Sequence, residues 1–138
     1  MPKPTKADLN KYRALLEHQL AVLKGDVGSM KDEALRASDQ DSSVDHLADQ
    51  GSDNYDQAFM LGLIENEEET IQLIEEALER LDGEGEWPFG ACPMCLEEVE
   101  AGTRKKADVW IPKERLEYVP WARYCVEHQA EVERRESA

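Results

Sequence analysis

Three cysteines and one histidine stand in two pairs that share the same three-residue offset. Cys92 and Cys95 lie in "ACPMC", and Cys125 and His128 lie in "CVEH". Each pair can offer two ligands from a tight turn, and together they complete the tetrahedral set that zinc prefers in structural sites. We therefore expect one Zn²⁺ bound by these four residues, which requires the two stretches to fold against each other.

Two other uses of the cysteines are open at this point. A redox dithiol at Cys92 and Cys95 would ordinarily follow a strand, for which the preceding residues give no pattern. Unrelated buried thiols would leave the pairing of Cys125 with His128 unexplained. A disulfide framework is disfavoured, because the cysteine count is odd and "MPKPTKADLN" at the start carries no secretion signal.

A closed shell of three cysteines and one histidine leaves no coordination position for water or substrate. Catalytic zinc sites keep such a position open, whereas closed sites contribute folding free energy. We therefore expect structural zinc, no catalytic residues and a protein that is not an enzyme. The leftover histidines, His18 and His46, are expected to be neither ligands nor catalysts.

The net charge of −15 over 138 residues is concentrated in the first part of the chain. Residues 1–91 hold 8 basic and 21 acidic side chains, whereas residues 92–138 hold 8 and 10. No Lys or Arg stands between Arg36 and Arg80, so this segment would repel the phosphates that nucleic-acid binding must neutralise. Direct DNA binding is thus disfavoured, and with no apolar run long enough to cross a bilayer we expect a soluble, cytoplasmic protein.

Two segments show helical periodicity. "TKAD" from Thr5 is typical of a capping box with Asp in place of Glu, and apolar residues then recur every seven positions in two interleaved series, as in a coiled-coil seam. Gly25 and Gly28 should soften its middle. The seam residues are Leu9, Leu16, Leu23 and Met30 with Leu20, Val27 and Ala34 in the first segment, and Met60, Ile64, Ile71, Ile74, Leu78 and Leu81 in the second.

The stretch "ASDQDSSVDHLADQGSDN" between these segments is rich in turn-forming residues. It predicts that the two helices fold back as an antiparallel hairpin with an acidic tip near residues 38–53. The fold expected is therefore mainly α: a coiled-coil hairpin over 1–86, followed by a zinc-finger globule and a C-terminal helix over 87–138. We expect a monomer, although a dimer of long helices would use the same heptads.

The compact end begins at "LDGEGEWPFGAC", whose glycines and proline end the second helix. Trp87, Trp110 and Trp121 are expected to pack this small core. The closing segment from about Pro120 predicts a final helix with Arg134 and Arg135 near its C-terminus, where the helix dipole favours cations.

The ending "IPKERLEYVPWARYCVEHQ" resembles that of the DksA/TraR family of bacterial zinc-finger regulators, in which the order is approximately I-P-x-x-R-L-x-x-x-P-x-A-x-x-C-x-x-C-Q. This chain differs in having His128 as the fourth ligand, a longer span between the cysteine pairs that includes "AGTRKKADVW", and a different spacing at the tip. The matching residues are Ile111, Pro112, Arg115, Leu116, Pro120, Ala122, Cys125 and Gln129.

The resemblance implies a regulator that binds RNA polymerase, inserting the hairpin through the secondary channel so that tip aspartates approach the catalytic centre. The family's tip reads D-x-x-D-x-A. Here Asp45 and Asp49 stand one residue further apart and are the preferred tip pair, whereas Asp53 and Asp56 match the spacing but lie further along.

A different class of function is also compatible with the composition. The Glu-rich face of the second helix, at Glu65, Glu67, Glu68 and Glu69, could let an acidic zinc-containing adaptor mimic nucleic acid or dock on another basic protein. The two hypotheses assign binding to different residues, so substitutions at the tip and on this face distinguish them.

Overall fold

The computed structural model describes residues 2–39 and 50–137, and within these ranges it does not describe the side chains of 34–39 and 50–57. These residues form helices and no strand, which confirms the mainly α prediction. They fall into two compact units, Met1–His18 with Leu73–Ala138 and Gln19–Gln72. The elements are α1 Lys6–Asp39, α3 Gln50–Leu81, α4 Pro93–Glu100, the 3₁₀ helix η1 Lys106–Asp108, α5 Lys113–Tyr118 and α6 Val126–Ser137.

The predicted capping box begins α1. The Thr5 N–H donates to Asp8 Oδ2 at 3.0 Å, and the Asp8 N–H donates to Thr5 Oγ1 at 3.2 Å. Two backbone donors that an N-terminus leaves without intrahelical partners are satisfied in this way. Lys113 of α5 lies 3.1 Å from the same Asp8 carboxylate, so the start of α1 is tied to a distant segment.

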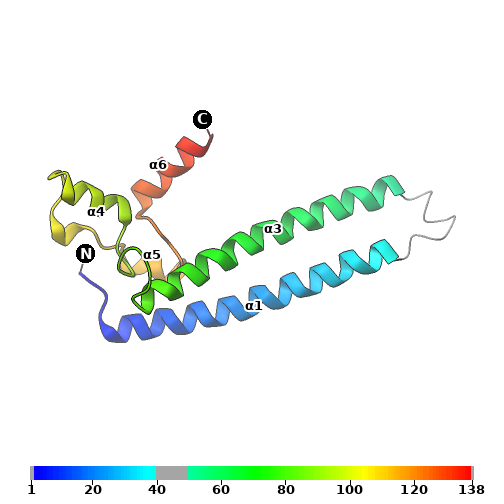
Figure 1. The fold of residues 1–138 in the computed structure, drawn as a ribbon, viewed down its shortest axis with the longest axis horizontal. Helices are drawn as coiled ribbons and strands as arrows, with labels where there is room; N and C mark the ends of the chain where they lie inside the picture. The colour runs from blue at the N-terminus through cyan, green and yellow to red at the C-terminus, as the bar shows by residue number, and fades with distance from the viewer. Residues whose placement is uncertain (1, 40–49, 138) are drawn as a thin grey trace. The chain divides into compact units, whose positions relative to one another are not determined.

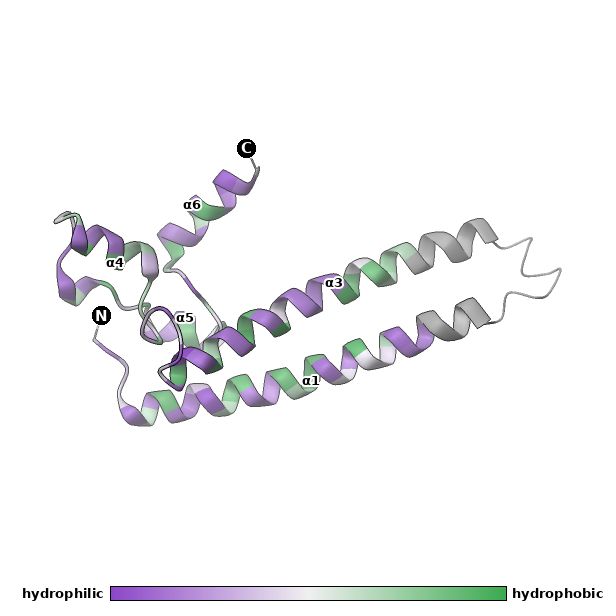
Figure 2. Ribbon diagram, viewed as in Figure 1, coloured by the Kyte–Doolittle hydropathy of each residue, from purple (hydrophilic) through white to green (hydrophobic). Residues whose placement is uncertain are grey.

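In the unit of residues 19–72, α1 and α3 run side by side in opposite directions, and hydrophobic turns alternate with hydrophilic ones along each helix (Figures 1 and 2). Leu23, Val27 and Ile64 are buried between them. Lys31 on α1 also pairs with Glu68 on α3 at 2.7 Å. The helical hairpin predicted from the two heptad series is confirmed.

In the other unit, the first turns of α1 pack against the last turns of α3. Leu16 and Ile74 are fully buried, and Arg13 pairs with Asp82 at 2.7 Å. Tyr12 is 1% exposed and its ring lies 5.8 Å from that of Phe89, although it is outside the predicted seam. Its burial comes from the segment after α3, which heptad spacing cannot reveal.

Fewer residues are buried along the seam than the heptad pattern predicted. Two helices alone can cover only a thin stripe, so Leu9, Leu20 and Ile71 remain half-buried. Gly25 and Gly28 lie inside α1, which continues through both of them. Ala34 has a side chain outside the part that the structure describes. Large apolar side chains left exposed beside the seam are Leu15, Val22, Phe59, Leu61 and Leu63.

A Schellman motif ends α3 at Gly83, which has a φ of +79° that favours glycine. The Glu84 N–H donates to the Glu79 carbonyl at 2.9 Å, and the Gly83 N–H donates to the Arg80 carbonyl at 3.1 Å. The chain is thereby turned from α3 into the loop before the first cysteine pair.

The core of the compact end is aliphatic with one phenylalanine. Trp87, Trp110 and Trp121 are all half-buried, so the expectation that tryptophans fill this core is only partly met. An isolated antiparallel bridge joins Ala91 to Trp110. Besides the cysteines of the first pair and Pro120, the buried apolar side chains are Phe89, Ala91, Val109, Ile111, Leu116 and Ala122.

The last helix is shorter than predicted, because α6 begins at Val126 and residues 119–125 are not helical. The Ala122 N–H closes a turn on the Val119 carbonyl at 3.0 Å, and Cys125 follows directly before α6. Among the helices in the described ranges, none combines the length and apolar character needed to span a bilayer.

Replacing Asp8 with Asn should lower the melting temperature at neutral pH and leave it unchanged in acid. The Thr5 backbone N–H first, and then Lys113, lower the pKa of Asp8 below its usual 3.8. A carboxylate with a depressed pKa stabilises the fold above its unfolded pKa and loses that contribution as pH falls through the folded value. Thermal melts at several pH values measure this difference. Asp26→Asn, at an exposed position within α1, is the control; an equal loss in both variants at all pH values would contradict the role assigned to Asp8.

Candidate metal centre

Both pairs of candidate ligands stand at the start of a short helix. Cys92 is the N-cap of α4, with Pro93 at the first helical position, and Cys95 follows in the first turn. Cys125 directly precedes α6, and His128 lies in its first turn. In each pair the residue after the second ligand donates its N–H to the carbonyl of the first, Leu96 to Cys92 at 3.1 Å and Gln129 to Cys125 at 2.9 Å. The two turns therefore present their ligands in the same way.

The four ligand atoms converge, all lying within 4.8 Å of one another. His128 Nδ1 is 3.1 Å from Cys125 Sγ, 3.3 Å from Cys95 Sγ and 3.4 Å from Cys92 Sγ, while Cys95 and Cys125 Sγ are 3.9 Å apart. A tetrahedral zinc with its usual bond lengths separates two sulfurs by about 3.8 Å and sulfur from nitrogen by about 3.5 Å. The donor set and its spacing fit a zinc ion.

Burial makes this cluster of thiols and imidazole energetically unfavourable when no cation is bound. Cys92 is fully buried, Cys95 is 2% exposed and His128 is 5% exposed. Burial first, and then the neighbouring Cys92, raise the pKa of the Cys95 thiol. Thiolates are the form that binds metal, so a bound dication would offset the burial and the mutual repulsion that hold this thiol protonated.

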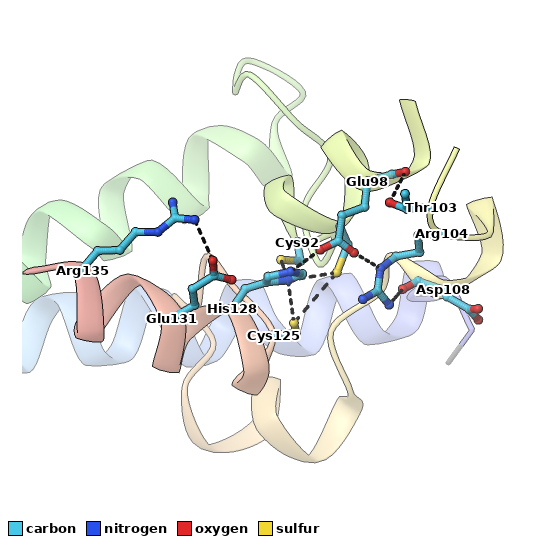
Figure 3. Close-up of polar contacts among 10 residues, drawn as sticks. Cys92, Glu98, Thr103, Arg104, Asp108, Cys125, His128, Glu131 and Arg135 are labelled. Atoms are coloured by element: carbon cyan, nitrogen blue, oxygen red, sulfur yellow. Dashed lines mark hydrogen bonds and ion pairs between the residues drawn. The ribbon is translucent and has the colours of Figure 1, made fainter. Parts of the chain in front are cut away.

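Glu98 of α4 orients the imidazole from the side away from the sulfurs. His128 Nε2 lies 2.6 Å from Glu98 Oε1, as Figure 3 shows, while Nδ1 faces the cysteines. A histidine that ligates metal through one nitrogen ordinarily donates its other N–H to a carboxylate or carbonyl, which fixes the tautomer and the ring orientation. Glu98 occupies that position.

Arg104 in turn holds Glu98. Its Nε donates to Glu98 Oε2 at 2.7 Å, and its Nη1 donates to the Asp108 carbonyl at 3.4 Å (Figure 3). The hydrogen bond from Arg104 first, and then that from His128, lower the pKa of Glu98, so the carboxylate stays ionised. Lys105 and Lys106, its neighbours in "AGTRKKADVW", are exposed.

The metal ligands were predicted from sequence, but Glu98 and Arg104 were not. Nothing in the spacing of "EEVEAGTRKK" distinguishes Glu98 from the adjacent Glu97. The usable signal was the histidine itself, since a buried imidazole ligand requires an acceptor for its second nitrogen.

The predicted tip residues, Asp45 and Asp49, lie outside the described residues, as does His46. Asp53 and Asp56 belong to α3, but their side chains are also outside the description. His18 is exposed on α1, and its lack of a role stays a prediction.

Comparisons with known proteins show which solved structure this architecture resembles. No model of a known protein family matches the sequence, and no curated protein matches it. Among solved structures, the chain is similar to transcription factor DksA2 from Pseudomonas aeruginosa, with a TM-score of 0.70 and 25% sequence identity over 96% of this chain and 88% of that chain. The chain has a DksA-like fold.

This similarity confirms the resemblance predicted from "IPKERLEYVPWARYCVEHQ" and the hairpin order. The coverage includes the long helices as well as the compact end, whereas the sequence resemblance was specific only over residues 71–129. The cluster of Cys92, Cys95, Cys125 and His128 fits a zinc finger of the DksA type and could hold a metal ion.

Replacing Cys125 with Ser should remove the bound metal and much of the stability of the compact end. Structural zinc in small domains contributes about 10–16 kcal/mol of binding free energy, so even partial loss should lower the melting temperature clearly. Metal content by elemental analysis and thermal unfolding measure the two effects, with exposed His18→Ala as the control. If the wild type carried no zinc, or Cys125→Ser kept the wild-type melting temperature, the four-ligand assignment would be wrong.

Glu98→Gln should weaken zinc binding about 10-fold to 100-fold without abolishing it, the range expected for outer-shell partners of ligating histidines. The amide loses the charge that strengthens the hydrogen bond from His128 Nε2 and releases Arg104. Competition with a chromogenic chelator gives the affinity. Glu97→Gln, an exposed neighbour on α4, should match the wild type; equal weakening by both would mean that only surface charge matters.

Proposed function

We propose that this chain is a transcription regulator that binds RNA polymerase and acts through the secondary channel with the acidic tip of its helical hairpin. The single observation that carries this proposal is the similarity to transcription factor DksA2 over 96% of the chain, and the four-ligand cluster agrees with it. The tip residues in this proposal are Asp45 and Asp49.

In this proposal the metal ion has a structural role. Cys92, Cys95, Cys125 and His128 would bind one zinc ion, and four protein ligands leave no open position for a substrate or an activated water. Glu98, the nearest carboxylate on α4, bonds to His128 Nε2 and Arg104, so it is occupied in orienting the ligand. The chain would act by binding rather than by catalysis.

Charge supports a protein partner in preference to DNA. The hairpin has no basic residue between Arg36 and Arg80, whereas Glu65, Glu68 and Glu69 are exposed on α3. Such a surface repels phosphates and is attracted to basic protein surfaces. A monomer without direct sequence-specific DNA contacts is the form we propose.

Capture of RNA polymerase core from cell extract tests this function. The wild type should capture polymerase, and Asp45→Asn with Asp49→Asn should reduce that capture and its effect on transcription from a purified promoter complex. Asp53→Asn with Asp56→Asn is the matched pair, with the same loss of charge on α3. Failure of the wild type to bind polymerase would contradict the proposal, and a loss confined to the Asp53 and Asp56 pair would move the working tip to those residues.

The adaptor alternative has one specific observation in its favour. Phe59, Leu61 and Leu63 are exposed on α3 near the exposed glutamates, which is a composition suited to a basic partner with apolar side chains. Under that alternative, Glu65→Gln, Glu68→Gln and Glu69→Gln together should abolish partner capture, while the Asp45 and Asp49 pair should have little effect.

A further inference from the structure

The last turn of α3 and the loop that follows it line a cavity of about 500 Å³. Arg80 and Trp87 contribute to its wall, together with Arg123 from the segment before α6. None of the four metal ligands lines it. A volume of this size is within the range of small-molecule sites.

Arg80 is unusually buried for a charged residue, with 6% of its surface exposed. The loop is fitted over it: a Cβ on Gly85 would lie 2.3 Å from Arg80 Cγ, so only glycine allows this approach. The guanidinium stacks 4.9 Å from the centre of the Trp87 ring. Buried arginines are ordinarily paired with a carboxylate, but Arg80 forms no ion pair within the described part of the chain.

Three buried N–H groups around this cavity have no hydrogen-bond acceptor among the described residues. They are Arg80 Nε, Trp87 Nε1 and Arg123 Nε. Leaving a buried donor without an acceptor is expensive, and native proteins rarely do so. All three side chains line the cavity, so its wall is rich in N–H groups and suits a ligand group rich in acceptor oxygens.

Charge indicates what that group is. Burial first, and then the positive charge of Arg123, lower the pKa of Arg80, so the two guanidinium groups repel each other. Glu76 bonds to Arg123 Nη2 but leaves Arg123 Nε without an acceptor. A planar carboxylate between the arginines would accept hydrogen bonds from their guanidinium groups and relieve the repulsion.

The remaining lining residues limit the ligand's total charge. Glu79, Glu84 and Glu86 line the same cavity and are exposed. Together with Glu76 they place four carboxylates next to the arginines, which disfavour ligands with several negative charges and favour one that also carries a cation. A free polyphosphate therefore fits poorly, whereas a molecule with one carboxylate and one ammonium group fits both sets of side chains.

We propose that this cavity is a binding site for a small zwitterion of the amino-acid type, with its carboxylate on Arg80, Trp87 and Arg123 and its ammonium group facing Glu79, Glu84 and Glu86. The site is independent of polymerase binding and of the metal centre. A second hollow of about 430 Å³, lined by Leu9, Leu81 and Phe89 among others, shares Arg80 and Trp87 with it, so an apolar side chain on the ligand could extend along that wall.

The three tryptophan indole N–H signals of the ¹⁵N-labelled, zinc-loaded full chain test this site. Glycine, leucine, acetate and inorganic phosphate are titrated separately, with sodium chloride matching ionic strength. The expected result is a saturable downfield shift of the Trp87 signal with glycine or leucine, at lower concentration than with acetate or phosphate. Trp87→Phe assigns the signal, and the indoles of Trp110 and Trp121 should not move.

Variants separate the carboxylate contacts from the ammonium contacts. Arg80→Gln should weaken amino-acid binding at least about tenfold, because a hydrogen bond to a charged group is lost. Arg13→Gln, at an arginine outside the cavity, should leave binding unchanged. If Arg80→Gln fails to fold, neutralising the exposed Glu79, Glu84 and Glu86 with Gln should still weaken binding of glycine and strengthen that of acetate.

Three results would overturn the proposal. No saturable Trp87 shift with any amino acid would mean that the cavity holds only water. Equal shifts with sodium chloride would mean that the signal reports ionic strength. Tighter binding of phosphate than of glycine or leucine would contradict the charge argument, since the glutamates would then not select against polyanions.

Discussion

The compact end depends on one cluster, in which three thiol sulfurs and an imidazole nitrogen lie within 4.8 Å of one another. Two of the cysteines and the histidine are almost wholly buried, and burial raises the pKa of the Cys95 thiol, which stays protonated in the absence of a cation. A bound dication would stabilise the thiolate and join α4 to α6, two helices too short to form alone in water. The aliphatic core around Ile111 and Leu116 is small, and small cores commonly need a metal to complete their stability.

Two departures from the family pattern are connected in this structure. Histidine in the fourth position leaves a second ring nitrogen that needs an acceptor, and Glu98 supplies it. Arg104, which fixes Glu98, comes from the longer span between the cysteine pairs. The same span provides Val109, whose carbonyl accepts from the Cys92 N–H at 2.8 Å, and Trp110, which bridges Ala91. Residues of "AGTRKKADVW" thus support the histidine-containing cluster from outside.

Sequence patterns predicted the features that depend on local spacing. The capping box at Thr5 and Asp8, the antiparallel helices and the convergence of Cys92, Cys95, Cys125 and His128 are all found in the structure. Contacts between distant parts of the chain that leave no regular spacing in the sequence were not predictable.

Tyr12 is buried because Phe89 covers it, and Arg80 is buried because the loop through Gly85 closes over it. Both residues stand at positions that heptad counting assigns no special environment. The tryptophans were expected in the core because of their size, yet they are half-buried, whereas the smaller Ala91 and Ile111 are buried.

The most direct test of the metal-centred account is X-ray absorption at the zinc edge of the purified full chain. The arrangement of donors predicts one zinc per chain with three sulfur ligands at about 2.3 Å and one imidazole nitrogen at about 2.0 Å. A shell containing oxygen or fewer than three sulfurs, or a chain purified without any metal and with its thiols reduced, would contradict it.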